Sequence, residues 1–303
     1  METSQHDIRR GVHRVAADHG LELDASTIDV NEMGLDFRVA IARTVTDESW
    51  VLRFPRRTDV LDRADVEGRL LRIVAPHLSV AVPDWRIRSA DLIAYPLLPG
   101  TPGLTLTDAG EPVWHVDDSS DAYAESLGDF LAELHAFDPA EASASGIESR
   151  APDEAREKWR ADIARVTAEF EVADHLVRRW DAWLREDDYW PQRSVLTHGE
   201  VYPAHTLVID DAVTGVVDWT TAAIGDPARD FVFHRSSASP RAFERTVRRY
   251  VERGGHVWPR FAEHCDELYS TNPVAYGLYA LETDNPTHRE AAAALLNPPD
   301  PTE

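Results

Sequence analysis

The sequence predicts an α+β fold in which a small antiparallel sheet precedes a larger, mainly helical region. Apolar and polar residues alternate in three short runs between residues 27 and 55, a pattern typical of strands with one buried face. Apolar residues recur every three or four positions over most of the chain after residue 103, as expected of amphipathic helices. Strand-like runs return only briefly, between residues 194 and 219. This order of elements indicates two regions of different architecture.

The N-terminal region is predicted to begin with a helix over residues 6–20 that ends at Gly20. The predicted strands that follow cover residues 27–34, 36–44 and 49–55, with Gly34 and residues 46–48 in the turns. A helix over residues 60–75 and two strands at about 84–89 and 91–95 complete the region. Residues 96–103 are rich in proline and glycine and are predicted to form a linker at the domain boundary. We therefore predict two domains, residues 1–98 and 99–303.

The second region is predicted to be helical with a short β interruption. Its clearest helix spans residues 124–137, where Leu127, Phe130, Leu131 and Leu134 follow helical spacing. Two more helices are expected within 153–187, and the helical pattern resumes from about residue 228. Two short β segments at 194–199 and 206–219 are expected around a turn, and residues 297–303 are expected to fray.

The charge of the chain excludes some partners. The 303 residues include 31 basic and 54 acidic side chains, a formal net charge of −23. Residues 1–100 hold 13 basic against 16 acidic residues, and the remainder holds 18 against 38. Without a cationic excess, non-specific binding to nucleic acid or to an anionic membrane is excluded. The acidity is expected to serve solubility, with a site for a cationic small molecule as the alternative.

Targeting and cysteine content indicate a cytoplasmic protein. No run approaches the roughly 18 apolar residues of a membrane span, and the first ten residues lack the apolar core of a secretory signal. The single cysteine, Cys265, excludes an intramolecular disulfide and a cysteine-based zinc site.

Residue types suited to catalysis are concentrated between residues 198 and 230. The segment contains His198, Glu200, His205, Asp218, Asp226 and Asp230. A carboxylate on a loop after a strand can orient an attacking hydroxyl, and two further ligand-type side chains can hold Mg²⁺ on a triphosphate. The spacing therefore predicts phosphoryl transfer, against the alternative of a polar β-turn-β segment with ordinary capping carboxylates. Five other histidines lack a metal-ligand pattern and are expected to cap or pack: His13, His135, His234, His256 and His264.

At these residues the sequence resembles the aminoglycoside and macrolide phosphotransferases, antibiotic kinases with a bilobal protein-kinase-like fold. The resemblance covers nearly the whole chain and is strongest to the macrolide 2′-phosphotransferases, through VNEMGLDFRV, WVLRFPRR, VPDWRI, LIAYPLL, THGEVYPAHTLVID, GVVDWTTA and GGHVWPR. It implies a nucleotide-binding first domain and a second domain with the catalytic loop and the substrate pocket. It also implies that His205 and Asp218 bind Mg²⁺, and that His198 and Asp230 brace the catalytic loop.

Position 200 departs from the family pattern, which has aspartate where this chain has Glu200. Glutamate keeps the carboxylate but adds a methylene group, and a misplacement of about 1 Å can cost about 10²-fold in rate. Because such a group mainly orients the hydroxyl in a loose transition state, we expect weakened rather than absent turnover.

The nucleotide side follows from the same resemblance. Kinase-like folds place a lysine on the phosphates, yet the only lysine here is Lys158, outside the first domain. Arg53 occupies the matching strand position, with Glu67 as its expected partner, and arginine also binds phosphate. Gly34 is a weaker candidate for close approach to phosphates. Backbone groups of Tyr95, Pro96 and Leu98 are expected to meet the base of GTP or ATP, and the resemblance favours GTP.

The substrate side is expected among the C-terminal helices. Macrolides are large, mostly apolar rings with a dimethylamino sugar, so their site needs apolar and aromatic walls with a few carboxylates. The candidates are Tyr202, Phe231, Tyr276 and Tyr279, although aromatic residues at helical spacing commonly form core.

The sequence thus predicts an antibiotic kinase that transfers the terminal phosphoryl group of GTP or ATP to the 2′-hydroxyl of a macrolide amino sugar. One alternative keeps the fold and replaces the acceptor by an aminoglycoside or another small-molecule alcohol. The other is a nucleotide-binding pseudokinase weakened by Glu200.

Overall fold

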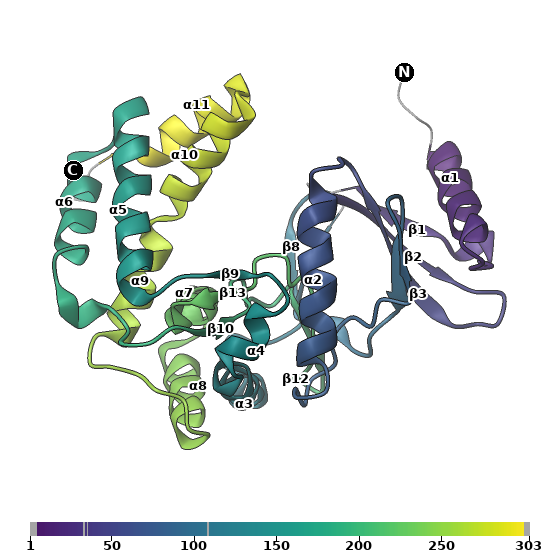
Figure 1. Cartoon of the computed structure of the whole chain (residues 1–303), viewed down its shortest axis with the longest axis horizontal. Coiled ribbons are helices and arrows are strands. Elements are labelled where there is room, and N and C mark those ends of the chain that lie inside the picture. Colours follow the sequence, from purple (N-terminus) through teal and green to yellow (C-terminus); the bar gives the residue numbers. More distant parts are fainter. Residues whose placement is uncertain (1–4, 33, 35, 108, 300–303) are drawn as a thin grey trace. The chain divides into compact units, whose positions relative to one another are not determined.

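The computed structural model describes residues 5–32, 34, 36–107 and 109–299 and divides into two compact units (Figure 1). The first unit comprises residues 1–115, 144–147 and 203–220, and the second comprises residues 116–143, 148–202 and 221–303. The compact units therefore do not follow the boundary after residue 98 that the sequence suggests. The assignment of nucleotide binding to residues 1–98 stays a prediction.

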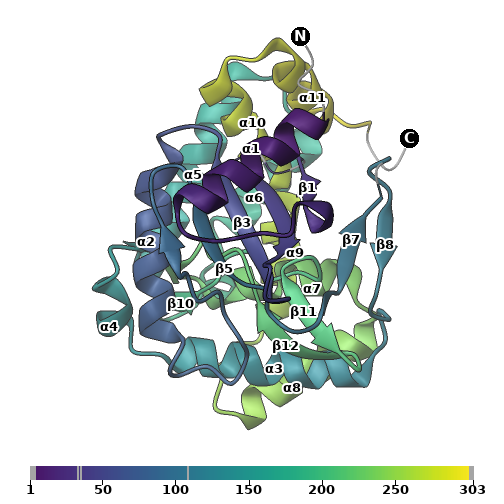
Figure 2. The same ribbon diagram turned by 90° about the vertical axis from the view of Figure 1, so that its right-hand side faces the viewer.

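The first unit is built on a five-stranded antiparallel sheet with the order β1-β2-β3-β5-β4. Its strands are β1 (Asp29–Asn31), β2 (Phe37–Arg43), β3 (Ser49–Pro55), β4 (Ile87–Arg88) and β5 (Ile93–Pro96). Helices α1 (Gln5–Asp18) and α2 (Val60–Val74) cover opposite faces of this sheet, and α1 crosses in front of it in Figure 2. A short 3-10 turn, η1 (Ala25–Thr27), precedes β1.

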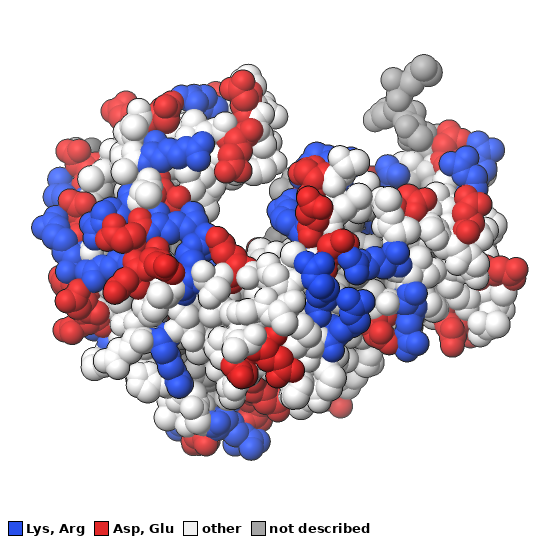
Figure 3. Space-filling view, viewed as in Figure 1, with Lys and Arg blue, Asp and Glu red and all other residues white. Residues whose placement is uncertain are grey.

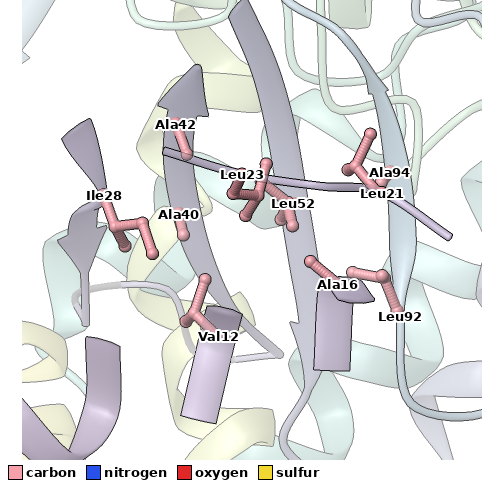
Figure 4. Packing of buried hydrophobic residues seen from close by; sticks show 10 residues of the cluster. All are labelled: Val12, Ala16, Leu21, Leu23, Ile28, Ala40, Ala42, Leu52, Leu92 and Ala94. Atoms are coloured by element: carbon pink, nitrogen blue, oxygen red, sulfur yellow. The ribbon is translucent and has the colours of Figure 1, made fainter. Parts of the chain in front are cut away.

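Strand alternation places different residues under the two helices. Even-numbered residues of β2, β3 and β5 pack with α1, in a layer that contains Val12, Ala16, Leu21, Leu23, Ile28, Ala40, Ala42, Leu52, Leu92 and Ala94 (Figure 4). Odd-numbered residues pack with α2, in a layer that contains Phe37, Val51, Val60, Ala64, Ile93 and Tyr95. Because side chains alternate between the faces of a strand, Arg53 belongs to the face that α2 covers.

Two hairpins complete the first unit and extend it past residue 98. Strands β11 (Thr206–Ile209) and β12 (Ala212–Val216) pair with each other, and β6 (Thr101–Pro102) pairs with β11. Strands β7 (Leu104–Leu106) and β8 (Pro112–Trp114) form the other hairpin. Residues 96–103 thus contain a strand, which the sequence missed because two residues of β6 carry no alternation and their partner lies a hundred residues away.

The second unit is mainly helical. Its helices are α3 (Asp121–Ala136), α4 (Pro139–Ser143), α5 (Pro152–Glu169), α6 (Asp174–Trp183), α7 (Val232–Ser237), α8 (Pro240–Glu252), α9 (Phe261–Ser270), α10 (Asn272–Thr283) and α11 (Pro286–Leu296), with 3-10 turns η2 (Asp187–Tyr189) and η3 (Pro227–Phe231). The two helices expected within 153–187 are α5 and α6. The predicted α+β class is confirmed.

A small sheet in the second unit contains the strand that leads directly into His198 and Glu200. Strand β10 (Val195–Thr197) pairs antiparallel with β13 (Ala223–Gly225), and β9 (Glu148–Ser149) adds a parallel strand. The sequence was wrong to join β10 with the 206–219 segment around one turn, because β10 pairs with β13 and residues 206–216 form their own hairpin.

Surface charges are mixed. Lys and Arg alternate with Asp and Glu over the face seen in Figure 3. Ion pairs with at least one exposed partner, such as Arg245–Glu125 and Arg179–Glu267, occur in the described residues. Exposed pairs of this kind contribute little stability each. In the part of the chain that is described, no helix has the length and apolar character to cross a membrane.

Candidate active site

The candidate catalytic loop, residues 198–200, directly follows β10 in the second unit. His198 is fully buried and Glu200 is half-buried. Gly199 has φ +88°, and a Cβ atom there would lie 2.5 Å from the carbonyl oxygen of Thr221. The Thr221 hydroxyl also donates to the carbonyl oxygen of His198, at 2.9 Å. Only glycine allows the chain to turn against this neighbour, so the turn that presents Glu200 depends on Gly199.

Asp230 holds the loop with both of its carboxylate oxygens. Its Oδ2 accepts the backbone N–H of His198 at 3.0 Å, and its Oδ1 accepts the N–H of Gly199 at 2.6 Å. The Nε2 atom of His135, on α3, lies 3.1 Å from Oδ2. The structure therefore brings His198 and Asp230 together, through the backbone of His198.

The electrostatics of Asp230 follow from these contacts. Burial alone would raise the pKa of this carboxyl, but the hydrogen bond and charge of His135, with the charge of His198 and the Gly199 N–H, hold the pKa below its ordinary value. Asp230 is thus ionised at neutral pH and accepts hydrogen bonds without donating any.

A pocket of about 300 Å³ opens beside Glu200 within the second unit. Its walls are mainly apolar, formed by Trp159, Val232, Phe233, Leu268 and Ala275. Among the described lining residues, Glu200 is the only carboxylate and Arg229 the only cation, and the neutral polar groups are Thr221, Thr271 and Asn272. The acidic excess of the chain is therefore not concentrated in this pocket.

The four predicted substrate residues fall into three different environments. Tyr202 packs against the pocket residue Phe233, with ring centroids 5.2 Å apart. Tyr276 and Tyr279 are half-buried on α10 and stack 6.1 Å apart, on the helix face that also carries Asn272. Phe231 is fully buried against Tyr250 and Phe261, and it exposes no surface to a ligand. We correct its assignment to core packing.

In the first unit, Arg53 and Glu67 form a buried ion pair. Arg53 Nη1 lies 2.9 Å from Glu67 Oε1, and the side chains are 9% and 0% exposed. The guanidinium lies over the rings of Phe37 and Trp85, 4.1 and 5.6 Å from their centroids. Burial alone would lower the pKa of Arg53, but the charge and hydrogen bond of Glu67, together with the charges of Tyr95 and Asp218, outweigh burial, and the pKa lies above its ordinary value. Arg53 is therefore a permanent cation clamped between two rings and a carboxylate.

Glu67 is less completely held than its partner. Its Oε1 also accepts the backbone N–H of Trp219, at 3.4 Å, whereas Oε2 has no hydrogen-bond partner among the described residues. Burial raises the pKa of Glu67, and the charge and hydrogen bond of Arg53 oppose that rise.

The candidate residues for the base lie at the end of β5. Tyr95 is buried, which raises its pKa to about 12, and its backbone pairs with Val51 of β3. The N–H of Leu97 donates to Ser49 at 2.8 Å. Since backbone groups alternate between the edges of an antiparallel strand, the carbonyl of Pro96, the last residue of β5, points away from β3. Leu98 lies two residues beyond the strand, and its contact with the base stays a prediction.

Gly34 lies between β1 and β2, as predicted. A Cβ atom there would lie 2.4 Å from the carbonyl oxygen of Phe37, so the turn itself requires glycine. Arg56 Nε donates to the Gly34 carbonyl at 2.9 Å. A phosphate contact at Gly34 stays a prediction.

The two candidate metal ligands are neighbours in the first unit. His205 Nε2 lies 3.5 Å from Asp218 Oδ2, and the side chains are 14% and 43% exposed. Asp218 has φ +64°, a left-handed conformation that aspartate tolerates, and its Oδ1 accepts the Thr220 hydroxyl at 2.6 Å. No group of three or more potential ligands occurs in the described residues. Mg²⁺ is commonly held by carboxylate, phosphate and water, so the Asp218 carboxylate fits such a cation, whereas an imidazole is a less usual ligand for it and the role of His205 stays a prediction.

One loop carboxylate in a pocket, a buried cation on a strand and a paired metal-ligand set are the parts that phosphoryl transfer requires. Residues 27–264 match the phosphotransferase enzyme family. The chain belongs to this family. It is also 38% identical over 287 residues to the uncharacterized protein YcbJ of Bacillus subtilis (strain 168), which covers 93% of this chain and 94% of that protein.

Several solved structures are also similar to this chain in sequence and fold. The chain is 58% identical to the apoenzyme of the macrolide 2′-phosphotransferase MphH from Brachybacterium faecium, with a TM-score of 0.92 over 96% of this chain and 98% of that one. It is 37% identical to a macrolide 2′-phosphotransferase type I, with a TM-score of 0.90 over 98% and 99%. A GDP and kanamycin complex of APH(2″)-IIIa is 19% identical, with a TM-score of 0.76 over 95% and 97%. The predicted fold and the predicted resemblance to macrolide 2′-phosphotransferases are confirmed.

Sequence reasoning missed several residues of this candidate site. The pocket residues Arg229, Phe233 and Asn272 lie far apart in the sequence, and no pattern unites them. His135 was expected to pack, yet it contacts Asp230. A signal was present, because His135 lies four residues after Leu131 and so continues the apolar stripe of α3 toward the core.

Proposed function

We propose that the protein transfers the terminal phosphoryl group of GTP or ATP to the 2′-hydroxyl of the amino sugar of a macrolide. The observation that carries the proposal is the pocket at Glu200, which sets one carboxylate against mainly apolar walls in a chain 58% identical to a macrolide 2′-phosphotransferase. A volume of about 300 Å³ is at the lower end for small-molecule pockets and suits the sugar that carries the hydroxyl.

On the acceptor side, Glu200 orients the hydroxyl and receives its proton. Transfer forms a bond between the acceptor oxygen and the terminal phosphorus and breaks the bond from that phosphorus to the nucleoside diphosphate. Gly199 and Asp230 fix the backbone from which Glu200 projects, which limits the misplacement that its longer side chain allows. The pocket walls exclude water from the hydroxyl.

On the nucleotide side, Arg53 neutralises phosphate charge while Glu67 and the rings of Phe37 and Trp85 hold its guanidinium. His205 and Asp218 would hold Mg²⁺, which when bound neutralises charge on the phosphate oxygens. The carbonyl of Pro96 at the end of β5 would offer the base an acceptor, and the N–H of Leu98 would offer it a donor.

The composition of the pocket favours a macrolide over an aminoglycoside. An aminoglycoside carries several ammonium groups and would need several carboxylates to replace their hydration. The described lining offers Glu200 alone and adds the cation Arg229. A macrolide is largely apolar and has one amino group, so its polar groups need fewer partners from the pocket than those of an aminoglycoside.

The test is mass spectrometry of an erythromycin-type macrolide incubated with the protein, Mg²⁺ and either GTP or ATP. We expect a gain of one phosphoryl group, no gain with Glu200→Gln, and no gain on kanamycin. Phosphorylation of kanamycin but not of the macrolide would contradict the proposal and favour an aminoglycoside as the acceptor. Nucleotide binding without product on any acceptor would favour the pseudokinase.

Position 200 has its own test. Because the extra methylene displaces the carboxylate by about 1 Å, we expect Glu200→Asp to raise turnover by up to about 10²-fold. An unchanged rate would show that the loop accommodates glutamate without loss.

A further inference from the structure

We propose that His135 and Tyr250 are positioning residues for the catalytic loop, and that they act on Glu200 through Asp230. Neither residue lines the pocket at Glu200. This proposal rests on the proposed function, because the reaction whose rate His135 and Tyr250 affect is the proposed phosphoryl transfer. All of the contacts that support it lie within the second unit.

The contacts form a continuous chain of buried polar groups. The Tyr250 hydroxyl lies 2.9 Å from His135 Nδ1, and His135 Nε2 lies 3.1 Å from Asp230 Oδ2. Asp230 then accepts the N–H groups of His198 and Gly199, the two residues that precede Glu200. The side chains of His135 and Asp230 are 2% and 0% exposed, so water does not compete for these bonds.

The direction of each hydrogen bond can be assigned along this chain. Since ionised Asp230 only accepts, His135 Nε2 carries a proton and donates it to Oδ2. Burial raises the pKa of Tyr250 to about 12, so its hydroxyl keeps its proton and, 2.9 Å from His135 Nδ1, donates it there. We assign the Nε2–H tautomer of His135 on this basis. Tyr250 thus selects the tautomer that Asp230 needs.

Packing fixes the two positioning residues in place. His135 lies on α3 and Tyr250 on α8, and the helices approach closely because Gly128 has no side chain: a Cβ atom there would lie 2.8 Å from the carbonyl oxygen of Thr246. On the other side, a Cβ atom at Gly255 would lie 2.4 Å from the Tyr250 ring. Both side chains therefore have little freedom, as a positioning device requires.

Substitutions at His135 separate positioning from packing. His135→Leu keeps the volume but removes the donor, and we expect kcat to fall roughly 10- to 100-fold with the KM values for macrolide and nucleotide changed less than about threefold. His135→Gln places an amide N–H near the Nε2 position and should recover most of the loss. His135→Asn places its amide near the Nδ1 position, short of Asp230, and should not.

A cavity beside the chain allows a second rescue. A space of about 440 Å³ is lined by His135 and Tyr250, and it gives a small molecule access to the hole that His135→Ala would leave. Added imidazole should restore kcat of His135→Ala in a saturable manner and leave the wild type unchanged. Failure of both imidazole and His135→Gln to restore kcat would overturn the proposal.

The smaller effect is expected at Tyr250. Tyr250→Phe removes one hydrogen bond, whose net worth corresponds to about tenfold or less in kcat. The matched control is His234→Gln, another buried histidine of the same unit, which contacts Thr246 at 2.8 Å instead of Asp230. It should leave kcat within about twofold of the wild type. A loss at His234 equal to that at His135 would show a structural role only.

Hydrogen exchange supplies a readout that needs no activity. The amides of His198 and Gly199 should exchange at least tenfold faster in His135→Leu than in the wild type, and at the wild-type rate in His234→Gln. Unchanged exchange in His135→Leu would overturn the proposal. If the wild type phosphorylates no acceptor, the proposed function fails, and exchange still decides whether His135 positions the loop.

Discussion

Glu67 in the first unit and Asp230 in the second are both fully buried carboxylates, yet the protein holds them differently. Asp230 accepts three hydrogen bonds on its two oxygens, and its pKa lies below its ordinary value. Glu67 accepts bonds on Oε1 alone, Oε2 has no partner among the described residues, and its pKa is raised. Burial opposes ionisation at both sites, so the number of donors decides the direction of the shift.

The difference separates two uses of buried charge. Asp230 accepts donors from a helix and a loop on both of its oxygens, which makes it a fixed anchor for His198 and Gly199, the residues that precede Glu200. Glu67 keeps one unused acceptor, a group that costs about 1–3 kcal/mol when buried without a partner. We infer that Glu67 serves to hold the guanidinium of Arg53 in place more than to stabilise the fold.

The largest expected effect follows from Asp230→Asn. The amide would turn an N–H toward a backbone or histidine N–H, so we expect the free energy of unfolding to fall by about 3 kcal/mol and kcat by at least about 100-fold. Urea denaturation and steady-state kinetics measure the two. The exposed Asp181→Asn is the control and should change stability by less than about 0.5 kcal/mol. A loss at Asp230 no larger than at Asp181 would remove its status as an anchor.

The next effect concerns the loop that Asp230 holds. Gly199→Ala forces a side chain into φ +88° and against the Thr221 carbonyl, so we expect a stability loss of about 2 kcal/mol and severe loss of turnover. Gly225→Ala is the matched control, because that glycine has no positive φ and no atom within 4 Å of a Cβ atom. Equal thermal unfolding of the two variants would contradict the strained turn.

A smaller effect is expected where Glu67 holds its partner. Arg53→Lys keeps a positive charge but loses the planar stacking on Phe37 and Trp85, so we expect about 1 kcal/mol lower stability and a several-fold higher KM for the nucleotide. The KM for the acceptor should remain unchanged. An unchanged nucleotide KM would remove Arg53 from the phosphate site.

The smallest effect is the opposite pH response of the two carboxylates. Asp230 has a folded pKa below the ordinary 3.8, so its stabilisation is present above that pH and is lost as pH falls through the folded pKa. Glu67 has a folded pKa above the ordinary 4.5, so the free energy of unfolding falls as pH rises from about 4.5 toward that value. Unfolding measured against pH should lose the first slope in Asp230→Asn and the second in Glu67→Gln. The same slopes in both variants would assign the titrations to other groups.

The sequence predicted the elements whose signals are local. Alternation marked β2 and β3, and helical spacing marked α2 and α3, because each pattern lies within one element. The candidate site residues of the 198–230 segment also follow from residue types that lie close together in the sequence, and their roles stay predictions. Strands β6 and β13 were missed because two or three residues carry no periodicity and their partners are distant in sequence.

The residues of the candidate site likewise fall into those that local sequence patterns suggest and those that only packing identifies. Residue types and spacing selected Glu200, His205 and Asp218, since phosphoryl transfer needs a carboxylate and oxygen or nitrogen ligands in that order. They also suggested Phe231 as a pocket wall, where tertiary packing buries it against Tyr250 and Phe261. A helical aromatic residue has the same local pattern in a core and in a pocket, so only packing distinguishes them.

By itself, the sequence determined the α+β class, the family and the segment that carries the chemistry, because these depend on periodicity and on the kinds of residue near one another in the chain. Only the tertiary structure decided that both oxygens of Asp230 have donors while Glu67 Oε2 has none among the described residues. It also decided that His135 contacts both Tyr250 and Asp230, and that Arg229 and Glu200 line one pocket. Each of these depends on groups from separate elements meeting at hydrogen-bond distance, and burial then gives those contacts their strength.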